Sequence, residues 1–165
     1  MPLIETDSAT RAFIDPVIEA VVVMFDRMFE SGVRQTAISS TQSDCLFETT
    51  SIVGLAGDYS GSFCISAPNE TLFAIVKRAL DLERTEVDRL CRDSLNELAN
   101  VIAGYAKDRL IEDDIKLGLP TAVQGRGVAI NYPQTVEPVR IDFESDMGRL
   151  MVVFGLVRRT KGDSQ

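Results

Sequence analysis

Apolar and polar positions along the chain predict helices separated by β-rich segments. The first helix begins at Asp15, a good N-cap, followed by Pro16, which is tolerated at the first helical position. It ends before Gly32, and its segment Ala20–Phe25 is apolar nearly all round, which predicts a heavily buried helix. Residues 1–14 are mixed in character and are expected to form an N-terminal arm or a short strand.

A β-hairpin and two helices are predicted next. The β-rich runs 45–55 and 62–66 flank a turn that contains Gly, Asp and Ser, as hairpin strands do. A helix is expected over about 69–82, with Asn69 as its cap, and a second helix over about 85–111.

The remaining third of the chain reads mainly as β-structure. Residues 112–120 form a charged connection, and residues 121–131 form a strand that two glycines interrupt. A final hairpin pairs 139–144 with 150–157, and the polar tail 158–165 is expected to be flexible.

This order of elements predicts an α+β fold, because helices and hairpins segregate along the chain. A largely antiparallel sheet would pack against the long helices. The length suits one domain over residues 1–165. A faint repeat relates the acids of Asp15–Glu19 to those of Asp93–Glu97, and Gly32–Ala37 to Gly118–Ala122. It predicts two pseudo-symmetric halves, each with a helix and a hairpin.

Charge and composition exclude several classes of protein. The net charge of −8 argues against binding to nucleic acid and to anionic membranes. The sequence contains no His, which excludes Ser/His/Asp and Cys/His triads, phosphohistidine relays and His-ligated zinc.

Compartment is indicated by the cysteines and by the lengths of apolar runs. Cys45, Cys64 and Cys91 form no CxxC pair, which is typical of reduced, structural cysteines in the cytoplasm. The acidic N-terminus does not resemble a signal peptide. The longest apolar run has six residues, whereas a membrane span needs about 20.

The helix over 85–111 carries the candidate chemistry. On a projection with about 3.6 residues per turn, its apolar residues cluster on one face, which is expected to be buried. These are Cys91, Leu95, Leu98, Ile102 and Tyr105. A polar stripe lies nearly opposite and consists of Asp93, Glu97, Asn100 and Gly104, with Lys107 at its far end.

Such a stripe is most often a solvated helix face, but two of its members are poor choices for that purpose. Asn100 is a weak helix former, and Gly104 costs about 1 kcal/mol relative to alanine in a helix interior. The glycine lets a partner approach closely, and the carboxamide can orient a water molecule. Glu97, one turn earlier, can hold a cationic group of a partner.

The sequence Asp93-Ser-Leu-Asn-Glu97-Leu-Ala-Asn100-Val-Ile-Ala-Gly104 resembles the signature helix of the CheX/CheC/FliY chemotaxis phosphatases, in which Glu-x-x-Asn is followed by Gly. Two other segments are also similar to CheX: Leu119–Gly125, and Phe13–Ala20 at the start of the first helix. The resemblance spans about residues 12–157. CheC-type members carry Glu-x-x-Asn on both long helices. Here Glu19 is present but Val22 replaces the Asn, so the chain resembles CheX, with one working site.

The resemblance implies a CheC-like α/β sandwich that dephosphorylates the aspartyl phosphate of a CheY-like receiver in two-component signalling. Asn100 would position the attacking water, and Glu97 would pair with the active-site Lys of the receiver. Asp93, Gly104 and Lys107 would contact this partner. The receiver would supply Mg²⁺, and the chain would need no metal or cofactor of its own. Relatives also imply a cytoplasmic homodimer, for which the β-rich hairpins could supply a sheet edge.

Three alternatives remain open at this stage. The same face could bind a phosphorylated receiver without turnover, as a scaffold, or the chain could be a structural subunit. Residues Glu112–Asp114 could hold a metal in a hydrolase, although an acidic helix end or loop is usually just solvated. The Gly125-Arg-Gly127 segment lacks the third glycine and the following helix of a nucleotide-binding loop.

Overall fold

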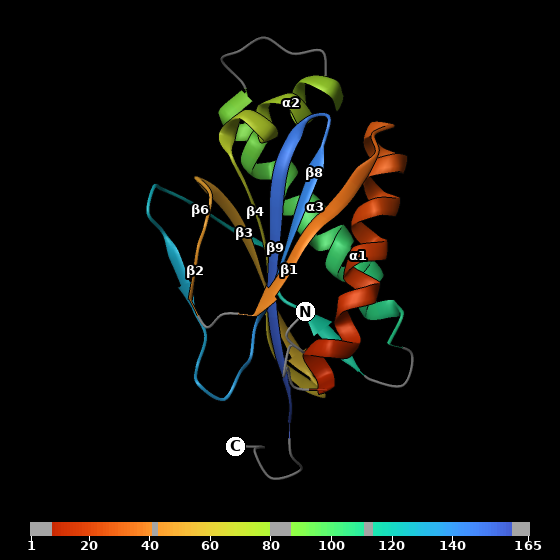
Figure 1. The fold of residues 1–165 in the computed structure, drawn as a ribbon, viewed down its shortest axis with the longest axis vertical. Coiled ribbons are helices and arrows are strands. Elements are labelled where there is room, and N and C mark those ends of the chain that lie inside the picture. Colours follow the sequence, from red (N-terminus) through yellow and green to blue (C-terminus); the bar gives the residue numbers. More distant parts are fainter. Residues whose placement is uncertain (1–7, 41–42, 80–86, 111–113, 160–165) are drawn as a thin grey trace.

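The computed structural model describes residues 8–40, 43–79, 87–110 and 114–159, which form an antiparallel sheet with helices packed on one face (Figure 1). The helices are α1 (Ser8–Phe29), α2 (Asn69–Ala79) and α3 (Val87–Asp108). The strands are β1 (Val33–Ser40), β2 (Ser43–Cys45), β3 (Thr49–Gly57), β4 (Tyr59–Ala67), β5 (Ile115–Leu117), β6 (Thr121–Gln124), β7 (Ala129–Asn131), β8 (Val139–Ser145) and β9 (Gly148–Arg158).

The predicted α+β class and the two related halves are confirmed by the strand order β1-β8-β9-β4-β3-β5, in which β6 also pairs with β3. The hairpins β3–β4 and β8–β9 meet at the centre through β4 and β9. Each long helix is followed by a strand that crosses to the hairpin of the other half. Strand β1 after α1 pairs with β8, and β5 and β6 after α3 pair with β3.

The start predicted for the first helix is wrong, because α1 begins at Ser8 and contains Pro16 in its interior. The segment expected to be an arm therefore supplies the first two turns, apart from residues 1–7, which lie outside the described part. Phe13 is fully buried, and its ring packs edge-on against the ring of Phe154, with the two ring centres 5.4 Å apart. Thr10 Oγ1 donates to the Leu156 carbonyl at 3.0 Å. This packing offsets the roughly 3 kcal/mol that an interior proline costs.

The N-terminal cap predicted for α2 is also wrong in its chemistry, although α2 begins at the expected residue. The carbonyl of Pro68 accepts the first helical hydrogen bonds, from the N–H groups of Thr71 and Leu72. The Asn69 side chain instead accepts a hydrogen bond from Thr49 Oγ1 at 2.8 Å, which ties the start of α2 to β3. The predicted end of this helix lies outside the described residues, as do both predicted ends of α3.

Strand β5 falls in the segment expected to be a connection, β1 falls where no element was predicted, and β2 coincides with the start of the first β-rich run. Strand β1 reads as polar because it is an edge strand with mostly exposed side chains, among them Arg34, which pairs with Glu144 at 2.9 Å. The strand expected over 121–131 is divided between two sheets, since β6 joins the main sheet and β7 pairs with β2. The expected tail begins one residue later, because Arg158 ends β9; residues 160–165 lie outside the described part.

Two apolar clusters lie on opposite faces of the sheet. The main core lies between the sheet and the helices and includes the buried aromatic rings of Phe13, Phe25, Phe63 and Phe154. A smaller cluster on the other face contains Leu46, Cys64, Met151 and Val153, and Ile130 of β7 packs against it. Among the described helices, none is both long enough and apolar enough to cross a membrane.

The ends of α1 and α2 are fastened to the β8–β9 turn by one carboxylate. Asp146 accepts hydrogen bonds from the hydroxyl of Ser31 and from Arg78, the latter at 3.0 Å. The Ser31 hydrogen bond and then the Arg78 guanidinium hold the pKa of Asp146 below its ordinary value. The contact therefore stabilises the fold above the ordinary pKa of aspartate and is lost as the pH falls through the lowered value.

Candidate functional site

Helix α3 is anchored by one strongly apolar face, as its sequence periodicity predicts. Its fully or almost fully buried residues are Cys91, Leu95, Leu98, Ala99, Ile102, Ala103 and Ala106, which pack into the main core. Tyr105 was expected in this group but is only half-buried, because its hydroxyl donates a hydrogen bond to Glu19 of α1 at 2.9 Å. Polar contacts therefore join the two long helices beside the core.

Polar contacts also fix α3 against the β3–β6 side of the sheet. Asn96 Oδ1 accepts a hydrogen bond from Ser51 Oγ in β3 at 2.7 Å. One turn earlier, Arg92 donates to Gln124 in β6 at 3.0 Å. The helix is therefore held on both flanks, and the orientation of its outward face is well defined.

The predicted polar stripe lies on that outward face. Asp93, Glu97 and Asn100 are exposed, and Gly104 and Lys107 are half-buried. Residues three and four apart on a helix have Cβ atoms about 5–6 Å apart, so Glu97 and Asn100 are direct neighbours. The structure therefore brings together all five residues that the sequence singled out.

Glu97 and Asn100 differ from the rest of the stripe in having no internal partner. Asp93 forms an exposed ion pair with Arg89 at 3.8 Å, and Lys107 donates to the Ile115 carbonyl of β5 at 3.3 Å. Among the described residues, the side chains of Glu97 and Asn100 make no hydrogen bond or ion pair. A carboxylate and a carboxamide are thus both available to an external ligand.

Gly104 leaves an open place at the centre of this face. A Cβ atom built on Gly104 would meet only Leu117 Cδ1, at 3.9 Å, beyond its own helix backbone and chain neighbours. Alanine would therefore fit, so internal packing does not demand glycine here. The bare backbone allows a partner to come close to α3 one turn beyond Asn100.

A cavity of about 230 Å³ lies beside Glu97, between the C-terminal end of α1, α2 and α3. Its walls include the apolar side chains of Met28, Phe29 and Ile75, and Asp93 lines it together with Glu97. The free carboxylate therefore stands between open solvent and a partly apolar recess.

Glu19, the acid of α1 that corresponds to Glu97 in the internal repeat, already has hydrogen-bond partners within the chain. Glu19 accepts hydrogen bonds from Tyr105 and from Arg109, the latter at 3.0 Å. Val22 follows three residues later and is 42% exposed, with no polar group to offer. In α1, the acid therefore has an internal structural contact.

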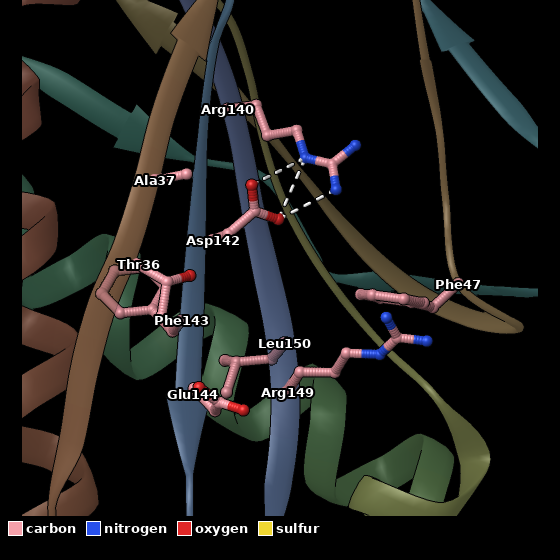
Figure 2. Close-up of a pocket in the computed structure, with 9 residues that line it drawn as sticks. All are labelled: Thr36, Ala37, Phe47, Arg140, Asp142, Phe143, Glu144, Arg149 and Leu150. Carbon is pink, nitrogen blue, oxygen red and sulfur yellow. Dashed lines mark hydrogen bonds and ion pairs between the residues drawn. The ribbon is translucent and has the colours of Figure 1, made fainter.

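A second hollow, of about 330 Å³, lies on the face of the sheet away from the helices (Figure 2). Its charged side chains satisfy one another or stack. Arg140 donates to Asp142 at 2.9 Å, and the guanidinium of Arg149 lies 5.0 Å from the ring centre of Phe47. Glu144 is paired with Arg34. The free, convergent polar groups are instead found on α3.

Metal-binding and thiol chemistry find little support in the described residues. Of the acidic run proposed for a metal, Glu112 and Asp113 lie outside the described part, and Asp114 is exposed. Within the described ranges, no three His, Cys, Asp or Glu side chains are grouped as metal ligands. Burial raises the pKa of the Cys64 thiol to about 11, so this thiol is protonated at neutral pH.

Sequence comparison finds one family. A model of the family described as "Chemotaxis phosphatase CheX" matches residues 49–144, which include the hairpin β3–β4, the whole of α3 and all but the last residue of β8. Comparison with curated proteins finds no match.

Solved structures share the fold at low sequence identity. A CheX protein from Desulfovibrio desulfuricans has a TM-score of 0.78 and 20% identity, over 88% of this chain and 99% of that chain. A CheC-like protein from a Shewanella species has a TM-score of 0.80 and 18% identity, over 88% and 97%. The complex of CheX with CheY, BeF3 and Mg²⁺ from Borrelia burgdorferi has a TM-score of 0.73 and 20% identity, over 89% and 98%.

Proposed function

Because the chain belongs to the CheX family of chemotaxis phosphatases, we propose that it dephosphorylates the aspartyl phosphate of a CheY-type receiver, using the outward face of α3. The observation that carries this proposal is the pair Glu97 and Asn100, both exposed and both without an internal partner among the described residues. The complex of CheX with CheY from Borrelia burgdorferi supports a receiver as the partner.

Asn100 is proposed to orient the attacking water. Phosphoryl transfer depends mainly on positioning and on stabilising charge, so a carboxamide that accepts and donates hydrogen bonds can complete a site that lacks only an aligned water. The side chain projects from a rigid helix whose two flanks are fixed to the sheet and to α1. It can therefore enter a partner's site without reorganising this chain.

Glu97 is proposed to pair with a lysine in the active site of the receiver. Its carboxylate stands one turn before Asn100, so the same approach brings both side chains to one site. Asp93, Gly104 and Lys107 are proposed to border the contact. Although Lys107 donates one hydrogen bond inside the chain, an ammonium group has three donors.

The chain is proposed to use no metal of its own, with Mg²⁺ held by the receiver. Mg²⁺ is usually bound by one or two carboxylates together with phosphate oxygens and water. The Borrelia burgdorferi complex contains Mg²⁺ together with CheX, CheY and BeF3, which agrees with this division of roles.

The decisive experiment measures phosphate release from a phosphorylated CheY-type receiver of the same organism, with and without this protein. Faster release in its presence, dependent on Mg²⁺, supports the phosphatase. Tight binding to the phosphorylated receiver without faster release would support the alternative of a non-catalytic scaffold that uses the same face.

Replacing Glu97 with glutamine is expected to weaken binding of the receiver while preserving the shape of the side chain. If Glu97 forms an ion pair in the complex, added salt should weaken the wild type more than the variant, because salt screens charge. The measurement is a binding titration at low and high ionic strength. Asp15→Asn, which removes an exposed acid from α1, is the matched control. Equal affinity of Glu97→Gln and wild type would exclude the ion pair.

A homodimer is proposed to form through β1. The central hairpins cannot supply an edge as expected, because β3 pairs with β5 and β6 on its outer side and β8 pairs with β1. Strand β1, with eight residues, is the longest outer strand of the described sheet, and an unpaired strand edge is a template for another chain. Light scattering should give twice the 18.1 kDa of the chain. A proline at Ser39 should shift the mass toward a monomer, and a monomeric wild type would exclude the proposal.

A further inference from the structure

The pairing of β5 and β6 with β3, at the edge of the sheet next to α3, is interrupted by one extra residue. Leu117 in β5 pairs with Leu55, and Thr121 in β6 pairs with Ile52. Between these two pairs, the segment that joins β5 to β6 advances by four residues, whereas β3 advances by three. The segment therefore contains one residue more than the strand it pairs with. This is a β-bulge, a feature found next to active sites, where it redirects a side chain.

The bulge presents an unusually exposed apolar side chain. Leu119 is 90% exposed, whereas the other large apolar side chains exposed in the described structure range from 37% to 42%. The segment around Leu119 is also held in place. The N–H of Gly118 donates to the Gly54 carbonyl at 2.8 Å, and Pro120 has a fixed φ angle. Leu119 is therefore displayed on an ordered backbone.

The bulge is level with the candidate catalytic side chain. Helix α3 runs alongside β5 and β6. Asn96 is level with β6, because it accepts a hydrogen bond from Ser51 of β3, and Ser51 pairs with Ala122 of β6. Eight residues further on, Gly104 lies beside Leu117 of β5. Asn100 is halfway between these two points, so the break between the strands, where Leu119 lies, flanks it.

We propose that Leu119 is an apolar docking residue that packs against an apolar patch of the receiver bordering its phosphorylated aspartate. This inference rests on the proposed function and adds to it the contact that supplies affinity. The ion pair proposed for Glu97 weakens as salt screens charge, whereas a short-range apolar contact keeps its strength, so Leu119 would supply affinity that does not depend on salt.

The ordered backbone makes such a contact efficient. Association normally costs entropy for each loop or side chain that becomes ordered at the interface. The hydrogen bond of Gly118 and the ring of Pro120 have already ordered the backbone on both sides of Leu119. Docking of Leu119 would also set the distance from which Asn100 reaches the phosphoryl group.

The test compares Leu119→Ser with Val22→Ser, which removes an exposed apolar side chain from α1. The probe is the CheY-type receiver loaded with BeF3 and Mg²⁺ for binding, and the phosphorylated receiver for turnover. Leu119→Ser should raise Kd and KM about tenfold to a hundredfold at both low and high salt, as expected for one buried leucine. The kcat at saturation and the thermal melt should match the wild type. Leu119→Met should restore binding, and Val22→Ser should have no effect.

The possible failures can be told apart. If the wild type binds and hydrolyses normally and Leu119→Ser does so equally well, the docking role is wrong while the phosphatase stands. If the wild type neither binds nor hydrolyses, the proposed function fails and the docking role fails with it. A lowered melting temperature of Leu119→Ser, with unchanged affinity for the receiver among its folded molecules, would assign Leu119 to internal stability and overturn the proposal.

Discussion

Replacing Asn100 with alanine is expected to lower the rate of dephosphorylation by about a hundredfold or more, the size of effect seen when one preorganised polar group is removed from a reacting centre. The affinity for the receiver should change much less, because the carboxamide is proposed to align water in the transition state. Stability should change by no more than about 0.5 kcal/mol, since Asn100 is exposed and its side chain makes no internal hydrogen bond among the described residues. Single-turnover phosphate release and a thermal melt measure the two effects.

Asn96 provides a matched control on the same helix. Its side chain accepts a hydrogen bond from Ser51, so Asn96→Ala should reduce stability while dephosphorylation by the folded protein continues. The opposite pattern is expected for Asn100→Ala. If Asn100→Ala kept most of its activity, the water-positioning role would be excluded, and the face would be better explained as a surface that only binds.

The outward face of α3 was predictable because two local signals agree. The buried residues recur with the helical period, and the polar residues fall nearly opposite them, so exposure follows from periodicity alone. Asn100 and Gly104 add a second signal, since both weaken a helix without any internal packing that requires them. Residues of low helix propensity that stand in a helix without a structural reason are expected where the surface serves to bind a partner.

The edges of the sheet were not predictable from the same kind of pattern. Strand β1 is polar and exposed because it lies at an edge, and β5 has only three residues, so neither shows the alternation of a half-buried strand. Their positions depend on pairing with the hairpin of the opposite half, a contact that is distant in sequence. The bulge at Leu119 escapes sequence analysis for this reason, because it exists only relative to the register of β3.

The start of α1 shows how tertiary packing overrides a local signal. Asp15 and Pro16 together form a strong helix start, yet two turns of helix precede them. The faint internal repeat likewise concealed a difference that only contacts reveal. Glu19 resembles Glu97 in sequence, but it is bound to Tyr105 and Arg109, whereas Glu97 has no internal partner among the described residues. One acid links helices, and the other remains available.

Substitutions at Gly104 are expected to separate folding from docking. Gly104→Ala should stabilise the protein by up to about 1 kcal/mol, because alanine is the better helix former and its Cβ would make only an ordinary 3.9 Å contact with Leu117. Gly104→Leu should also fold, since the position faces outward, but its side chain would occupy the space that the receiver backbone or side chains need. Binding of the receiver should then fall at least about tenfold, the equivalent of about 1.4 kcal/mol.

Gly104→Ala is expected to raise stability, and Gly104→Leu is expected to weaken binding of the receiver. A thermal melt and a binding titration are therefore needed on both variants. A solvated face would tolerate either side chain, and Gly104→Leu would then bind the receiver as the wild type does. That result would remove Gly104 from the interface and leave Glu97 and Asn100 without the close approach that their proposed roles require. Gly104→Ala is expected to be more stable than the wild type in either case, so weaker binding of the receiver by Gly104→Leu would mean that the natural glycine gives up helix stability to accommodate a partner.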